Sequence, residues 1–194
     1  MSRAYPQVAL RPQDLVVLLR LTLQAGPAPS YADLAAELVL TASEVHAAVE
    51  RAALAQLARK DAKGKPSVVR EALRLFVLHG ARYAFPAVRG EITRGLPTGY
   101  AAAPLAGRIV APADEPPPVW PDKNGTTRGA TLHPLYPSVP QAAQRNPALY
   151  DLLVLFDAIR AGSPRERALS IDLFERQLAA HSASSTTPTI PQTA

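Results

Sequence analysis

The sequence contains no cysteine, which excludes disulfide bonds, thiol catalysis and cysteine-based zinc sites. Aromatic residues make up only 6% of the 194 residues, so a hydrophobic core must be built mainly from alanine, leucine and valine. Because alanine and leucine favour helix over strand, the composition predicts a mainly α protein.

Long apolar runs are absent as well. No stretch approaches the roughly 20 consecutive apolar residues that span a bilayer. Residues 1–13 have no apolar core of the kind that a signal peptide carries. We therefore expect a cytoplasmic protein that does not bind a membrane.

Several catalytic patterns are missing too. Gly90 and Gly95 have the spacing of half a phosphate-binding loop, but Leu96-Pro97 follows where a lysine and a hydroxyl residue are required. The histidines have no metal-ligand spacing, and no Gly-x-Ser-x-Gly elbow occurs. We therefore expect no enzyme activity, no cofactor and no metal site.

The net charge is modest, +5, and it is unevenly distributed. Residues 111–194 carry seven basic and eight acidic residues, so the whole positive excess lies in residues 1–110. A basic half beside a neutral half fits a domain that faces nucleic acid, joined to a segment that faces a partner. A slightly basic protein with no such partner fits equally well.

The first apolar segment, residues 14–23, predicts a buried helix. Pro12 stands at its first turn, where proline is tolerated, and Gly26-Pro27 breaks the chain after it.

Two helix-capping signals follow between residues 30 and 60. Ser30 is followed three residues later by Asp33, a variant of the capping box, and Thr41 is followed by Glu44, the box itself. Val39-Leu40 supplies an apolar turn between them. The pattern predicts a short helix, a tight turn and a longer helix, which together form a helix-turn-helix.

The segment Ser30–Val49 resembles the helix-turn-helix of bacterial winged-helix transcriptional regulators, MarR-like or related. The resemblance covers residues 10–105 and is most specific at the helix-turn-helix. It implies a winged helix-turn-helix domain at residues 1–103 that binds double-stranded DNA, usually as a homodimer, with the longer helix in the major groove. The residues that would then face the groove are Ala42, Ser43, His46, Ala47, Glu50 and Arg51.

This reading helix has no arginine or lysine in its first two turns, so phosphate affinity has to come from elsewhere. One candidate is the basic cluster of Arg59, Lys60, Lys63 and Lys65. The other is the glycine-rich segment that contains Arg89 and Arg94. Either could be the wing, which in many winged helices inserts arginines into a minor groove. A solvated loop is an equally good interpretation of the lysine cluster.

Residues 104–145 contain nine prolines, a density at which we expect no helix. Val119, Trp120 and Leu132 are interspersed among them. Because a flexible linker rarely carries such residues, we expect a proline-rich strap that lies ordered on a surface.

The last predicted element is a helical hairpin at residues 146–182, with helices that start at Asn146-Pro147 and Ser163-Pro164. Two helices cannot bury all of its leucines and phenylalanines. We expect them to pack on a second copy of the chain, with packing inside one chain as the alternative. Residues 183–194 are expected to be a disordered tail.

The function expected from these features is that of a sequence-specific, DNA-binding transcriptional repressor. The alternative is an adaptor or antitoxin-like protein, which would use the same helix-turn-helix core to bind a protein partner.

Overall fold

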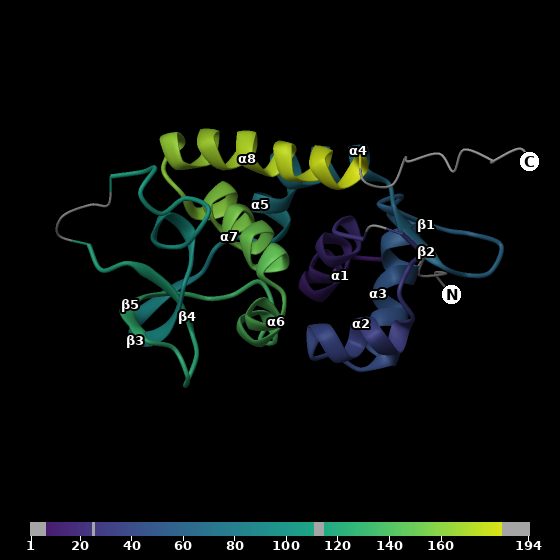
Figure 1. Cartoon of the computed structure of the whole chain (residues 1–194), viewed down its shortest axis with the longest axis horizontal. Coiled ribbons are helices and arrows are strands. Elements are labelled where there is room, and N and C mark those ends of the chain that lie inside the picture. Colours follow the sequence, from purple (N-terminus) through teal and green to yellow (C-terminus); the bar gives the residue numbers. More distant parts are fainter. Residues whose placement is uncertain (1–6, 25, 111–114, 184–194) are drawn as a thin grey trace, which may run out of the picture.

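Helix α7, Pro147–Ala161, lies at the centre of a computed structural model that describes residues 7–24, 26–110 and 115–183 (Figure 1). The Asn146 side chain caps it by accepting a hydrogen bond from the Leu149 amide. From Leu152 to Arg160 every residue is buried, as expected for a helix that is surrounded by other elements. The fold is mainly α with small β-sheets, and α7 packs against both of its halves.

The N-terminal half contains three helices and a two-stranded hairpin, shown on the right of Figure 1. The helices are α1 (Pro12–Thr22), α2 (Tyr31–Leu38) and α3 (Ala42–Leu54), and the hairpin strands are β1 (Ala58–Lys60) and β2 (Pro66–Val68). The strands pair antiparallel. The three helices expected from the sequence are thus confirmed, although the third ends at Leu54 and not near Arg59, because strand β1 begins at Ala58.

Both predicted capping boxes are present. The Ser30 hydroxyl accepts a hydrogen bond from the Asp33 amide, and the Thr41 hydroxyl accepts one from the Glu44 amide. In each box the carboxylate accepts a hydrogen bond from the amide of the capping residue. These contacts use polar groups that a helix start otherwise leaves unpaired.

A continuous helical segment leads from the hairpin to the other half. It consists of α4 (Arg70–Leu75), a π-helical turn at Phe76–Gly80 and α5 (Ala81–Ala84). The Arg70 guanidinium donates hydrogen bonds to the carbonyl of Thr22 near the end of α1 and to the carbonyl of Leu178 in the last helix. It therefore joins the carboxyl ends of two helices, where positive charge is favoured.

The other half contains a small closed barrel, on the left of Figure 1. Its strands are β3 (Arg89–Pro97), β4 (Pro118–Pro121) and β5 (Thr127–Leu132), and β3 is followed by a 3-10 turn, η2, at Gly99–Ala101. β3 pairs antiparallel with both β4 and β5. A Cβ atom at Gly95 would lie 1.9 Å from the Trp120 carbonyl oxygen, so the close approach of β3 and β4 requires glycine there.

The barrel corrects the predicted organisation of the chain. We expected a boundary at residue 103 and a strap at 104–145, but β3 precedes that boundary and pairs with two strands that follow it. Helix α6, Val139–Arg145, also forms where no helix was expected. Its proline, Pro140, is in the first turn, where the missing N–H would have had no helical partner. The prediction that this proline-rich segment is ordered is confirmed at Trp120, which is buried.

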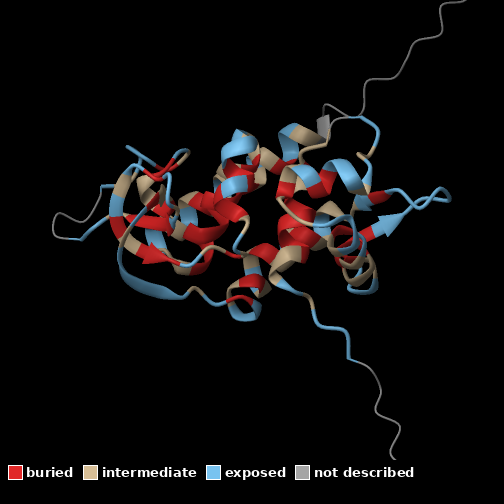
Figure 2. Ribbon diagram, turned by 90° about the horizontal axis from the view of Figure 1, so that it is seen from below, coloured by how far each residue is buried: buried red, intermediate tan, exposed pale blue. Residues whose placement is uncertain are grey.

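The C-terminal hairpin consists of α7 and α8 (Pro164–Ala183), which runs along the top of Figure 1. Its apolar residues pack inside this chain. α7 contacts α1, α5, α6 and α8, and Phe174 and Leu178 of α8 are buried. Figure 2 shows the buried residues running through the middle of the molecule from one half to the other. α7 therefore packs inside one chain, which was the alternative to packing on a second copy. The tail expected at residues 183–194 lies, beyond residue 183, outside the residues that the structure describes.

No helix within the described ranges combines the length and the hydrophobicity that a membrane crossing requires.

A buried ion pair connects α7 to the barrel. The Arg160 Nε atom donates to Asp157 Oδ1 at 2.8 Å, and the exposed fractions of the two side chains are 4% and 1%. Thr98 Oγ1 and Trp120 Nε1 donate to the other oxygen of Asp157 at 2.8 and 2.5 Å. Burial raises the pKa of Asp157, whereas Arg160 and these two hydrogen bonds oppose the rise. Arg160 also donates to the carbonyl of His133 just after β5.

Replacing Asp157 with alanine should therefore lower the free energy of unfolding by about 3–5 kcal/mol, because the Arg160 charge would stay buried without a partner. Urea denaturation measures this. Asp172→Ala is the matched control, since its pair with Arg176 is exposed on α8, and it should cost less than about 1 kcal/mol. Equal losses in the two variants would contradict a structural role for the buried pair.

Candidate nucleic-acid interface

Helix α3 presents an exposed face near its amino end. Ser43 is exposed, the His46 side chain is 57% exposed and Ala47 is half-buried. The opposite face of α3 is buried against α1 and α2 through Val45, Val49 and their neighbours. Ser43, His46 and Ala47, three of the residues predicted to contact DNA, thus lie together on the outside of α3.

The turn between α2 and α3 determines how α3 is presented. Val39 has a φ angle of 55°, in the left-handed region that a β-branched residue rarely adopts. The Leu40 amide donates to the Ala35 carbonyl, which closes the turn against α2. Leu34 and Leu38 are fully buried between the helices. The tight turn is held by this packing, with no glycine in it.

Glu50, another predicted contact residue, is engaged by the hairpin. The Lys60 Nζ atom lies 2.6 Å from Glu50 Oε1, and the His46 Nε2 atom lies 3.5 Å from the same oxygen. The hydrogen bond from Lys60 lowers the pKa of Glu50, and the carboxylate raises the pKa of Lys60. The negative charge on this face is therefore neutralised by a residue from β1.

The hairpin tip contains two exposed lysines, Lys63 and Lys65. Asp61 Oδ1 accepts hydrogen bonds from the backbone amides of both lysines, each at 2.8 Å. Gly64 lies between them with a φ angle of 75°, a conformation that favours glycine. The acidic residue in this basic cluster thus orders the loop, and its two lysines extend from an ordered backbone.

Tyr31 connects the hairpin tip to α3. Its hydroxyl donates to the Gly64 carbonyl at 3.1 Å, and its ring meets the His46 ring edge to face with 5.4 Å between the centroids. Tyr31 was not among the predicted site residues. Its position as the first residue of a capped helix gave no sign that it would reach a loop 33 residues later.

Arg51, predicted to face the groove, is turned inward. Its Nε and Nη2 atoms donate to the two carboxylate oxygens of Asp14 in α1 at 2.8 and 2.6 Å. The Asp14 side chain is fully buried, and the Arg51 side chain is 16% exposed. A carboxylate buried among apolar residues requires a paired cation, so Asp14 within the apolar segment 14–23 was the sequence signal for this contact.

The two candidate wings lie at opposite ends of the molecule (Figure 1). Lys63 and Lys65 are beside α3, whereas Arg89 and Arg94 are on β3 of the barrel. Arg89 Nη2 donates to the Ala161 carbonyl at 3.3 Å, at the end of α7. Arg94 is directly opposite Arg128 of β5. Only the lysine cluster, among these two candidates, is adjacent to α3, the helix predicted to read DNA.

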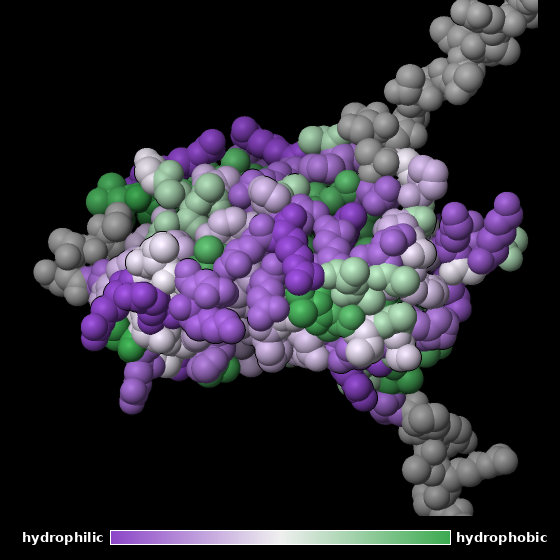
Figure 3. All heavy atoms as spheres, turned by 60° about the horizontal axis from the view of Figure 1, so that its bottom comes forward, coloured by the Kyte–Doolittle hydropathy of each residue, from purple (hydrophilic) through white to green (hydrophobic). Residues whose placement is uncertain are grey.

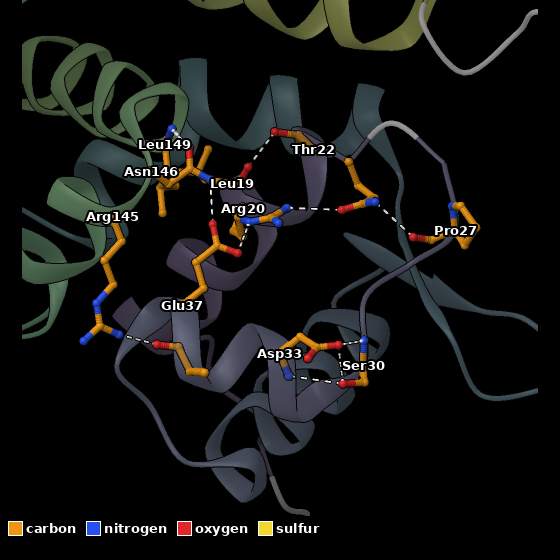
Figure 4. A network of polar contacts seen from close by, with 12 residues as sticks. Leu19, Arg20, Thr22, Pro27, Ser30, Asp33, Glu37, Arg145, Asn146 and Leu149 are labelled. Carbon is orange, nitrogen blue, oxygen red and sulfur yellow. Dashed lines mark hydrogen bonds and ion pairs between the residues drawn. The ribbon is translucent and has the colours of Figure 1, made fainter.

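Polar contacts attach α2 to the other half of the molecule (Figure 4). Glu37 accepts hydrogen bonds from Arg20 Nε at 2.7 Å and from Asn146 Nδ2 at 2.6 Å. Arg145, the last residue of α6, donates to the Ala36 carbonyl. The helices that carry the candidate interface are therefore held in a fixed position relative to α6 and α7.

A hollow of about 480 Å³ lies between the hairpin and the loop after α1, with Lys63, Lys65 and Arg70 among its lining residues. In the part of the chain that the structure describes, no group of three or more His, Cys, Asp or Glu could hold a metal ion.

Compared with protein-family models, curated proteins and solved structures, the chain has no match in any of the three.

Replacing Arg51 with alanine should lower the free energy of unfolding by about 3 kcal/mol, because Asp14 would be left as an unpaired buried carboxylate. Urea denaturation checks this prediction. Arg59→Ala is the control: this arginine is exposed on β1, and its loss should change stability by less than about 0.5 kcal/mol. Unchanged stability of Arg51→Ala would show that Arg51 is free for another role.

Proposed function

We propose that residues 12–68 form a winged helix-turn-helix and that the protein is a sequence-specific, double-stranded DNA-binding repressor that acts in the cytoplasm. In this proposal α2 and α3 are the helix-turn-helix, and the β1–β2 hairpin is the wing. The protein binds as a homodimer, since two-fold symmetric operators are read by two-fold symmetric proteins.

The observation that carries the proposal is the position of the β1–β2 hairpin beside the exposed face of α3. This hairpin contains Lys60, Lys63 and Lys65 and is called the lysine hairpin below. Lys60 neutralises Glu50, and Tyr31 holds the hairpin tip next to His46. An uncharged helix face with a row of cations beside it fits a duplex, because base edges are lined on both sides by phosphates.

Each residue then has a distinct part in the contact. Ser43 and His46 carry hydrogen-bonding groups that can reach base edges in the major groove, and Ala47 offers a methyl group to a thymine. Lys63 and Lys65 extend toward phosphates and contribute affinity without sequence preference. Arg51 supports α3 from inside through Asp14.

In this proposal the two copies do not pack on the apolar face of α7, where the sequence predicted the contact. The apolar face of α7 is covered within the chain, so the two copies must meet through other residues. Light scattering distinguishes the cases: a strict monomer, both free and bound to DNA, would remove the homodimer from the proposal.

A second candidate function is that of an adaptor that binds a protein partner through the same core. It is favoured by the low charge of the α3 face and by Leu54 near its end, which is 69% exposed. An adaptor should show no DNA binding even at about 50 mM salt, and it should co-purify with its partner.

The proposal is tested by salt-titrated binding of the chain to duplex DNA from its own upstream region. The variant K63Q/K65Q should bind more weakly and reduce the slope of log affinity against log salt by about two, one for each lost phosphate contact. S43A/H46A should instead reduce the preference for this DNA over a random duplex. The control R108Q/R165Q removes the same charge from exposed arginines elsewhere and should bind like the parent chain.

A parent chain that binds no duplex at about 50 mM salt would refute DNA binding. A loss in the control equal to the loss in K63Q/K65Q would show that only net charge matters.

A further inference from the structure

Two arginines face each other on the barrel without a partner. The antiparallel register of β3 and β5 places Arg94 directly opposite Arg128, and both residues are exposed. Like charges at directly opposed positions of neighbouring strands destabilise a sheet. Neither side chain forms a hydrogen bond or an ion pair with any other residue that the structure describes. Folding alone therefore does not explain this pair.

Two carboxylates close in sequence or in backbone pairing, Asp122 and Glu91, leave the arginines unpaired. The Asp122 amide donates to the Arg94 carbonyl, yet its carboxylate accepts from the Asn124 amide at 2.7 Å and from Gln144 Nε2 at 3.1 Å. Glu91, three positions before Arg94 on β3, forms no ion pair with either arginine. The positive charge at this place is therefore not neutralised by these neighbours.

The barrel backbone keeps the two arginines opposed. A Cβ atom at Gly95, next to Arg94, would lie 1.9 Å from the Trp120 carbonyl oxygen. A Cβ atom at Gly129, next to Arg128, would lie 2.0 Å from the Pro117 carbonyl oxygen. β4 and the residue before it therefore approach β3 and β5 so closely beside the arginines that only glycine fits there, and the register of β3 and β5 keeps the two arginines opposite each other.

The pair borders a hollow of about 310 Å³ whose other lining residues are Ile92, Thr93 and Thr126. Two guanidinium groups that line one hollow match the oxygens of a phosphodiester, since arginine binds phosphate through paired N–H groups.

The barrel and the lysine hairpin lie at opposite ends of the molecule (Figure 1), so their cations would contact different phosphates. Helix α8 has 20 residues and runs from above the barrel to above α4 (Figure 1). At 1.5 Å per residue it is about 30 Å long, and because the hairpin lies beyond its carboxyl end (Figure 1), the barrel and the hairpin are separated by at least the roughly nine base pairs of duplex that this length spans. In Figure 3, in which the bottom of Figure 1 comes forward, hydrophilic side chains occur at both ends and in the middle of the face, with an apolar patch to the right of the middle.

We propose that Arg94 and Arg128 form a second phosphate-binding site, which holds the backbone of duplex DNA beyond the segment that α3 reads. This inference rests on the proposed function, because α3 and the hairpin provide the primary contact. The second site lengthens the bound segment and adds affinity that does not depend on sequence.

The test compares R94Q/R128Q with the parent chain on two labelled duplexes, one of about 24 base pairs and a loop-closed one of about 8. The variant should bind the longer duplex roughly tenfold more weakly at low salt, with a salt slope lower by about two. It should bind the short duplex like the parent chain, because the short duplex cannot extend from α3 to the barrel. The control R108Q/R165Q should match the parent chain on both.

Other results separate the two proposals. Equal binding of R94Q/R128Q and the parent chain to the longer duplex, or the same loss on both lengths, would overturn the second site and leave the α3 contact intact. K63Q/K65Q should weaken both lengths, which tests the primary contact by itself. A parent chain that binds neither duplex would overturn both proposals.

A stability measurement checks the same site without DNA. Arg94→Gln should leave the urea midpoint unchanged or raise it, because the repulsion with Arg128 is removed. A lower midpoint would show that Arg94 has a structural partner and would overturn the proposal.

Discussion

The ion pair of Asp157 and Arg160 lies where α7, the barrel and the end of β5 meet, and the arrangement of the second half depends on it. Each side chain would be too costly to bury alone, and together they bond to each other, to Thr98, to Trp120 and to the His133 carbonyl. Their partners come from the residue before η2, from β4 and from the segment after β5, which are separated in sequence. One helical turn of α7 therefore determines where three distant segments of the chain lie.

The N-terminal half uses the same physical device. Asp14 and Arg51 join α1 to α3 through a second buried carboxylate and guanidinium, and the apolar residues around them complete the packing. Glu37 and Arg145 then attach α2 to α6 and α7. A buried ion pair thus holds each half, and hydrogen bonds from Arg145 and Asn146 join the two halves.

That rigidity matters for the proposed function. A protein that binds DNA through two places needs no ordering of its own parts on binding if these places are already at the right separation, and the loss of conformational entropy is then small. The charged side chains divide into two groups: Lys60 and Asp61 form contacts within the protein, whereas Lys63, Lys65, Arg94 and Arg128 are exposed, and the proposals assign these four to phosphates.

The sequence by itself determined the elements whose signals are local. The helices at residues 12–54 and their caps at Ser30 and Thr41 follow from short-range spacing, and so does the start of α7 at Asn146. Tertiary structure decided what depends on distant partners: the barrel that crosses residue 103, the inward turn of Arg51, and the contact of Tyr31 with the hairpin. A cap needs neighbours three residues away, whereas strand pairing and burial of a charge need a partner that only the folded chain supplies.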